Sequence, residues 1–236
     1  MPVGNSDRGV GLGAGEMMVF ADLSYQKFDW WHDKIPDAYD INGDLENFEH
    51  FGLLKNKTLN LGLSVGLSDW WNVTVSTQLA ERCMTWEGPV DSQGNSLTVH
   101  HRSECASDDF KFKGETRAFG GVLGDSKINF KYLLFNTGKG AGPRMFLGGG
   151  IFIPSSAELT ESPWKKNDLT DDGVDNPMYT PHRHFYLSDG TYKIFTEVQY
   201  FMKRKKMPVF WGGAFSMVFP LEKSDYGFSP SDRYSL

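Results

Sequence analysis

The stretch TLNLGLSVGL, from Thr58 to Leu67, decides the fold because its apolar and polar residues alternate without a break. Successive side chains of a strand point to opposite faces, so the pattern predicts a strand with one apolar face. That face carries Leu59, Leu61, Leu63, Val65 and Leu67. The opposite face has small and amide side chains instead of the Lys and Glu of a soluble edge strand. An apolar outer face and a small, polar inner face are what a closed barrel in lipid requires.

Similar alternation recurs along the chain, although the two strands near residues 150 and 215 are rich in glycine and less regular. No window shows a sustained period of about 3.6 residues, so no long helix is predicted. The seven predicted strands are Glu16–Phe28, Thr58–Leu67, Trp71–Ala80, Asp125–Phe135, Arg144–Ile153, Thr191–Met202 and Val209–Phe219.

The connections between these strands alternate in length. Short turns join the second strand to the third, the fourth to the fifth and the sixth to the seventh. The long polar connections are Asp29–Lys57, Glu81–Gly124 and Pro154–Gly190. This rhythm predicts an all-β, antiparallel up-and-down transmembrane β-barrel with short periplasmic turns and long external loops.

We expect a single domain over residues 1–236, with a flexible N-terminal segment at 1–15. Bacterial single-chain barrels have even strand numbers, and seven strands are predicted. Residues 220–236 have loop composition, so they are expected to lead to a missing strand, and the barrel is expected to be incomplete at the C-terminus. Residues 1–7 have neither the basic nor the apolar region of a secretory signal. Taken alone, that start favours a cytoplasmic protein, whereas an exported barrel would have lost its leader.

Bulk composition excludes several classes of function. The formal net charge of −6 argues against nucleic acid as a partner, because phosphate binding needs a clustered basic face. No run of 18 apolar residues is present, so no transmembrane helix is predicted. The chain has 26 glycines and 14% aromatic residues, a mixture that suits strands and turns more than helix bundles.

The polar faces of the predicted strands suggest what the barrel interior would present to a solute. Charged groups there could steer solutes and aromatic rings could contact apolar ones. Alternatively, salt bridges among these groups could simply fill a narrow barrel, because about eight strands leave room only for side chains. The lumen-facing candidates are Asp22, Lys127, Lys131, Lys193, Glu197, Phe146 and Phe152.

The catalytic and metal motifs in the chain lack the context that they need. GLSVG at residues 62–66 matches a nucleophile pattern, but it lies within a strand and not at a strand-to-helix turn. The His182/His184 pair has no companion ligands at convincing spacing. The sequence therefore predicts no catalytic residue, no metal and no cofactor.

The two cysteines, Cys83 and Cys105, fall in the same long connection. In an oxidising compartment they could close a loop of about 23 residues, which stabilises by about 3 kcal/mol on chain-entropy grounds. Two free thiols are the alternative. We expect the disulfide if the protein is exported.

Several short motifs resemble a family of bacterial outer-membrane proteins named for the MetA-pathway of phenol degradation, whose members are also described as outer-membrane transporters. The resemblance lies in GDSKINFKY at residues 124–132, GGGIFIPS at 148–155 and GLSDWWNV at 66–73. Ser155-Ser156 replaces the family's Thr-Gly after the glycine-rich strand. The resemblance implies a β-barrel that admits small hydrophobic or aromatic compounds, and it supplies no catalytic residue.

These observations predict a non-enzymatic barrel in the bacterial outer membrane that allows passive uptake of small, hydrophobic or aromatic solutes. Its expected partners are outer-membrane lipid, a small-molecule solute and the barrel-assembly machinery. The alternatives are a non-conducting structural barrel, an outer-membrane enzyme acting on lipid, and a soluble β-sandwich or lipid-binding barrel. An enzyme would need a Ser/His/acid set, for which Ser64, Ser76 and His182/His184 are the candidates.

Overall fold

The computed structural model describes residues 10–32, 50–87, 104–112, 115–118, 121–135, 137, 140–158, 185–204, 210–225 and 227–236. Within these ranges the chain is all-β and contains no helix. None of the described segments is a helix long and apolar enough to span a membrane.

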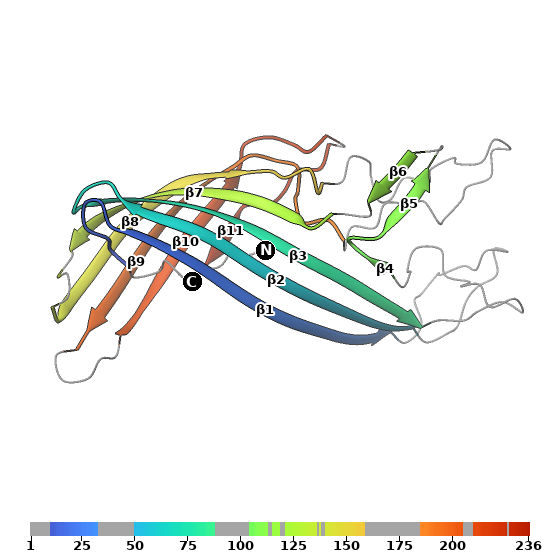
Figure 1. Cartoon of the computed structure of the whole chain (residues 1–236), viewed down its shortest axis with the longest axis horizontal. Coiled ribbons are helices and arrows are strands. Elements are labelled where there is room, and N and C mark those ends of the chain that lie inside the picture. Colours follow the sequence, from blue (N-terminus) through green and yellow to red (C-terminus); the bar gives the residue numbers. More distant parts are fainter. Residues whose placement is uncertain are drawn as a thin grey trace, which may run out of the picture.

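One antiparallel sheet contains almost all of the strands, and it follows the order of the chain. Figure 1 shows the sheet curling into half a barrel, with β1 and β11 as the edge strands of the described part. The short strand β4 (Glu104–Cys105) pairs with β3, and β5 (Asp109–Phe112) pairs with β6 (Glu115–Ala118) in a separate hairpin. The eight strands of the main path are β1 (Met17–His32), β2 (His50–Gly66), β3 (Trp71–Glu87), β7 (Leu123–Phe135), β8 (Gly142–Ile153), β9 (Lys193–Lys203), β10 (Phe210–Pro220) and β11 (Arg233–Ser235).

The seven predicted strands and their up-and-down order are confirmed, and the largest difference is in length. The β1–β2 ladder continues to the pair His32–His50, and β3 runs on to Glu87. These ends were predicted as loop because their residues no longer alternate in hydropathy. The neighbouring strand of a hairpin supplies main-chain hydrogen bonds whatever the side chains are. The paired strands can therefore extend beyond the residues that alternate between apolar and polar.

Three short strands in the predicted loop Glu81–Gly124 were not predicted, and neither was β11. The expectation of loop throughout 220–236 is wrong at Arg233–Ser235, where β11 pairs with Ser216–Val218 of β10. Strands of two to four residues are too short to show a period, which is why their sequence gives no signal.

Burial across the sheet is inverted relative to a water-soluble protein. On the inner face of β3, Asn72 and Thr74 are only 1% and 4% exposed. On the outer face of β1, Val19 and Leu23 are 79% and 81% exposed. Isolated exposed apolar residues are common, but a continuous apolar face is rare on soluble monomers and marks contact with a membrane or a partner.

Glycines on the inner face make room for large side chains on the neighbouring strand. Gly62 pairs with Phe20, and a Cβ at Gly62 would collide with the Phe20 ring. Gly148 pairs with Glu197, whose Cγ would lie 2.6 Å from an added Cβ. The concave side of a curled sheet is crowded, so these glycines allow the sheet to curl around its own side chains.

We predict that Gly150→Ala destabilises the folded sheet by about 1–3 kcal/mol, because the new Cβ would collide with the Ile128 carbonyl oxygen. Gly213→Ala is the matched control, since its Cβ would meet nothing within 4 Å. Urea unfolding in detergent micelles or vesicles measures both. Equal stability of the two variants would contradict this close approach.

Candidate functional site: the inner wall of the sheet

The predicted lumen residues share the inner face of the sheet. Cross-strand partners lie on one face, and Lys127 pairs with Phe152, which in turn pairs with Lys193. Two inward-facing rows further on, Lys131 pairs with Gly148, and Gly148 with Glu197. The two remaining candidates are placed by their own partners: Asp22 pairs with the buried Asn60, and Phe146 with the buried Gln199.

These candidates differ in how much of the side chain reaches solvent. Lys131 and Lys193 are each 2% exposed, and Glu197 is 8% exposed. Phe146 is fully buried, whereas Asp22, Lys127 and Phe152 are partly exposed. Ionised groups this deeply buried need partners, because an isolated buried charge is very costly.

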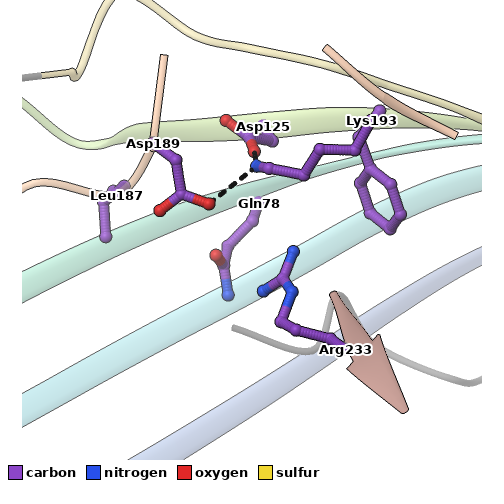
Figure 2. A pocket seen from close by; sticks show the side chains of 7 residues that line it. Gln78, Asp125, Leu187, Asp189, Lys193 and Arg233 are labelled. Carbon is purple, nitrogen blue, oxygen red and sulfur yellow. Dashed lines mark hydrogen bonds and ion pairs between the residues drawn. The ribbon is translucent and has the colours of Figure 1, made fainter. Parts of the chain in front are cut away.

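An ion-pair cluster surrounds Lys193 where β9 begins (Figure 2). The Lys193 Nζ lies 2.8 Å from Oδ2 of Asp125 and 3.0 Å from Oδ2 of Asp189. Asp125 comes from β7, whereas Asp189 lies in the segment before β9. The cluster therefore fastens residues 185–192 to the inner wall, at the end of the sheet that carries the long connections.

The same cluster borders a polar cavity of about 30 Å³. Space of this size holds one or two water molecules. Gln78, whose side chain borders this cavity, is only 4% exposed. The cavity is lined by Gln78, Asp125, Phe152, Leu187, Asp189, Lys193 and Arg233.

Two carboxyl groups near this cluster have shifted pKa values. Burial raises the pKa of Asp189, but the charges of Lys193 and Arg233 and the Lys193 hydrogen bond outweigh it, so the pKa lies below its ordinary 3.8. Burial, followed by repulsion from Asp225 and Asp125, raises the pKa of Glu158. Asp189 therefore keeps its charge, and its ion pair, in mildly acidic conditions.

A second polar network lies further along the inner wall. Oε1 of Glu197 accepts hydrogen bonds from Asn129 Nδ2 at 2.7 Å and from Gln199 Nε2 at 3.0 Å. The Lys127 Nζ lies 4.2 Å from the Phe195 ring centroid, a cation–π contact. The Lys131 Nζ lies 5.3 Å from the Phe146 ring centroid. Ammonium groups and phenyl rings therefore share one wall of the sheet.

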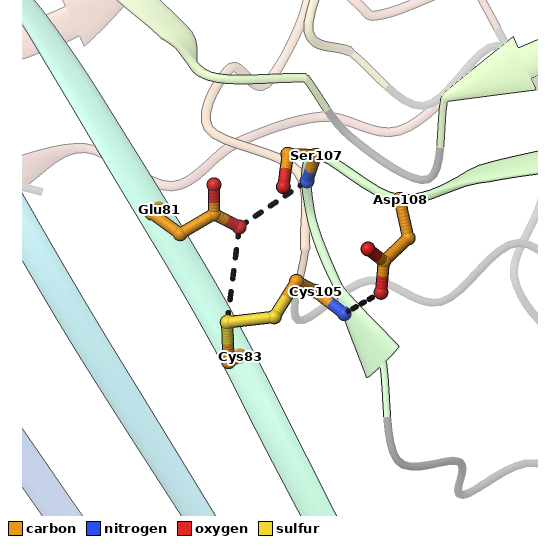
Figure 3. Close-up of a disulfide and its surroundings, with 5 residues drawn as sticks. All are labelled: Glu81, Cys83, Cys105, Ser107 and Asp108. Atoms are coloured by element: carbon orange, nitrogen blue, oxygen red, sulfur yellow. Dashed lines mark hydrogen bonds between the residues drawn. A yellow bond between two sulfur atoms is a disulfide. The ribbon is translucent and has the colours of Figure 1, made fainter.

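The disulfide predicted from sequence joins Cys83 of β3 to Cys105 of β4. Figure 3 shows it beside Glu81, whose Oε1 accepts a hydrogen bond from the Ser107 main-chain N–H at 3.2 Å. Glu81 and the two sulfur atoms lie close enough together to suggest metal ligands, but the disulfide leaves no thiolate to bind an ion. The bridge is structural and holds β4 against the extended part of β3.

A small apolar core lies beside the disulfide. Met84, Ala106 and Phe185 are at most 2% exposed, and Leu54 packs against them. The Arg82 Nη1 donates a hydrogen bond of 2.7 Å to the Tyr186 carbonyl. The segments around Ala106 and Phe185, which are distant in sequence, thus pack against β2 and β3 near Leu54 and Met84.

Sequence reasoning missed Gln78, Asp125, Asp189 and Arg233 as members of the inner site. Asp125 was assigned only to the start of a strand, and Asp189 lies in a connection with no periodic pattern. Ser64, a candidate nucleophile, is buried, and its Oγ lies 2.6 Å from the Thr74 Oγ1. His182 and His184 lie outside the described residues, so no Ser/His set is formed by the residues that are described.

Removing the cation from the ion-pair cluster should destabilise the protein. We predict that Lys193→Met costs about 3 kcal/mol, because two carboxylates would face each other without their partner. Lys27→Met is the matched control, since the Lys27–Asp29 pair is 3.6 Å long and largely exposed, and should cost well under 1 kcal/mol. Chemical unfolding at pH 7 measures the difference, and similar losses would show that the Lys193 cluster does not hold the wall.

Asp189 should make stability depend on pH. Its pKa is lower in the folded chain than in the unfolded one, so its stabilising effect is complete well above pH 4 and is lost on acidification through the folded pKa. We predict that Asp189→Asn costs about 1 kcal/mol at pH 7, discounted for partial exposure, and that the difference from wild type shrinks below about pH 4. Unfolding titrations at pH 7 and pH 3 test this, and a difference that grows on acidification would contradict the assignment.

Protein-family models, curated proteins and solved structures were each compared with the chain, and none of them matches. The resemblance to the MetA-pathway family thus stays a prediction carried by its short motifs. What can be said of function rests on the inverted burial of the sheet and on the polar, partly aromatic wall that it encloses.

Proposed function

We propose that the chain is an integral outer-membrane β-barrel protein whose apolar outer face contacts lipid. The observation that carries this proposal is the inverted burial of side chains on β2. Asn60 and Ser64 are buried, whereas Leu61 and Leu63, which lie between them in the sequence, are 37% and 43% exposed. A soluble β-barrel or β-sandwich would place the leucines inside. In lipid the same leucines are in their preferred solvent.

Rings at the turn end of the sheet support this placement. Trp71 and Tyr132 are cross-strand partners with ring centroids 4.9 Å apart, and Tyr200 and Trp211 lie 6.2 Å apart. All four lie near the ends of strands that meet the short turns, and Trp71 and Trp211 are about half exposed. Amphipathic rings gather at such positions at a lipid–water boundary.

Within this setting we propose passive uptake of small, hydrophobic or aromatic solutes along the inner wall. Support comes from Phe152 and Lys127, which are partly exposed on the wall, with the Lys127 Nζ 5.8 Å from the Phe152 ring centroid. Such a wall would offer an apolar solute ring contacts and a polar solute a charged group. The deep burial of the inner side chains points to a narrow path and not to a wide aqueous pore.

A non-conducting structural barrel is the second candidate, and the packing of the wall favours it. Lys131, Asn129 and Gln199 are each no more than 2% exposed, and much of the inner charge is paired within the protein. A barrel of about eight strands can be filled completely by its own side chains. Solute flux therefore separates the two candidates.

Flux is measured with purified protein in phospholipid vesicles loaded with a fluorescent reporter of aromatic solutes. Uptake predicts that phenol-sized aromatic solutes enter faster than in protein-free vesicles, and that a sugar of similar size gains less. Vesicles containing Lys193→Met should discriminate less between the two solutes. Rates equal to those of empty vesicles for every solute would favour the structural barrel.

We predict that Leu63→Arg costs about 2–4 kcal/mol of folding stability in vesicles, because the side chain would face hydrocarbon. Leu221→Arg is the matched control, since Leu221 is 55% exposed and follows the last residue of β10. Folding titrations into vesicles measure both. In a water-soluble protein an exposed Leu→Arg change stays within about 0.5 kcal/mol, so a neutral Leu63→Arg would overturn the membrane assignment.

A further inference from the structure

Residues 10–15 cross the inner face of the sheet at its turn end, and we call this segment the strap. The Leu12 main-chain N–H donates a hydrogen bond to Asn72 Oδ1 at 3.1 Å. The Asn72 Nδ2 donates in return to the Leu12 carbonyl at 2.9 Å. One side-chain amide thus holds both main-chain groups of Leu12, as a neighbouring strand would. Asn72 itself is only 1% exposed.

A second group of contacts holds the strap beside the same place. The Gly15 N–H donates to the Gly66 carbonyl at 2.8 Å, and the Gly66 N–H donates to the Glu16 carbonyl at 2.9 Å. The Ala14 N–H donates to Asp69 Oδ1 at 3.1 Å. A Cβ at Gly66 would collide with the carbonyl of Gly13, so the close approach depends on glycine at 66.

Gly66 and Asn72 fix the side of the sheet on which the strap lies. They are the last register pair of β2 and β3, and both belong to the buried, polar inner face. In Figure 1 the blue segment before β1 curves back beside the turn that joins β2 to β3. The strap therefore lies across the mouth of the inner wall, at the end opposite the Lys193 cluster.

We propose that the strap is a releasable seal at the turn end of the barrel. Its attachment differs from that of a strand: one main-chain bond joins Gly15 to Gly66, and its other bonds to the sheet end are made with the side chains of Asn72 and Asp69. Release would leave the ladders of β1, β2 and β3 intact, whereas removing any of those strands would dismantle the sheet. The proposal rests on the uptake function, because a seal matters only where solute passes.

Asn72→Leu tests the seal, because it keeps the approximate size of the side chain and removes both bonds to Leu12. Asn60→Leu is the matched control, since Asn60 is also a buried inner-face amide and has no contact with the strap. A Leu12→Cys reporter is placed in each background. Labelling by a maleimide that cannot cross membranes, in vesicles and from the turn side, reports strap release, and vesicle flux of an aromatic solute reports opening.

We expect Asn72→Leu to raise the labelling rate at position 12 by about tenfold, because two partly buried hydrogen bonds are lost. Solute flux should rise in the same variant, and the labelling rate should stay unchanged in Asn60→Leu. Gly66→Ala should also raise the labelling rate and the flux, because the new Cβ would push the Gly13 carbonyl away from β2. Gly213→Ala is its control, since a Cβ there would meet nothing within 4 Å. Agreement of these two chemically different substitutions would show that both rates rise because the strap is loosened and not because the Asn72 amide itself is lost.

The contrary outcomes separate the seal from the uptake function. If wild-type vesicles take up solute and neither Asn72→Leu nor Gly66→Ala increases the rate, the seal is overturned and uptake stands. If labelling rises in both variants but no protein conducts, both the seal and uptake are overturned. Unchanged labelling at position 12 in both variants would show that the strap is not held by these contacts, which also overturns the proposal.

Discussion

The structure depends on hydrogen bonding among polar side chains that have been turned inward. Asn72, Thr74 and Asn129 are almost completely buried, and their side chains hydrogen-bond to Leu12, Ser64 and Glu197, respectively. A buried polar group without a partner costs free energy, so this face holds together only where its members satisfy one another. The Glu197 network and the Lys193 cluster do so for the charged members. The apolar side chains are thereby left for the outer face of the sheet.

The inner wall is held at both ends by segments that are not part of the main ladder. At the long-connection end, residues 185–192 are fixed by Asp189, and the Cys83–Cys105 bridge holds a small apolar core nearby. At the turn end, the strap is fixed by Asn72 and Gly66. The two attachments differ physically: ion pairs and a covalent bond hold one end, and hydrogen bonds alone hold the other. A seal that opens without unfolding the barrel is better placed where the bonds are weaker.

Prediction of the site from sequence succeeded for residues inside a periodic strand. Lys127, Lys131, Lys193 and Glu197 could be placed on the inner face because each occupies a polar position in a strand whose other face is mainly apolar. Their partners could not be found in this way. Asp189 lies in a connection, and Arg233 lies in a strand of three residues, so neither has a period from which a face could be read. Asn72 was assigned to the polar face, but its role in holding Leu12 involves residues 60 apart in sequence.

Alternation of side chains was sufficient to determine the all-β class, the seven long strands, their order and the face to which each residue belongs. It could do so because the period of two is a local property of the backbone. Only the tertiary structure decided which charged side chains form ion pairs, which glycines lie under an aromatic ring of the neighbouring strand and where the strap crosses the sheet. Those depend on register and curl, and a register is fixed by the fit of two strands to each other and not by either sequence alone.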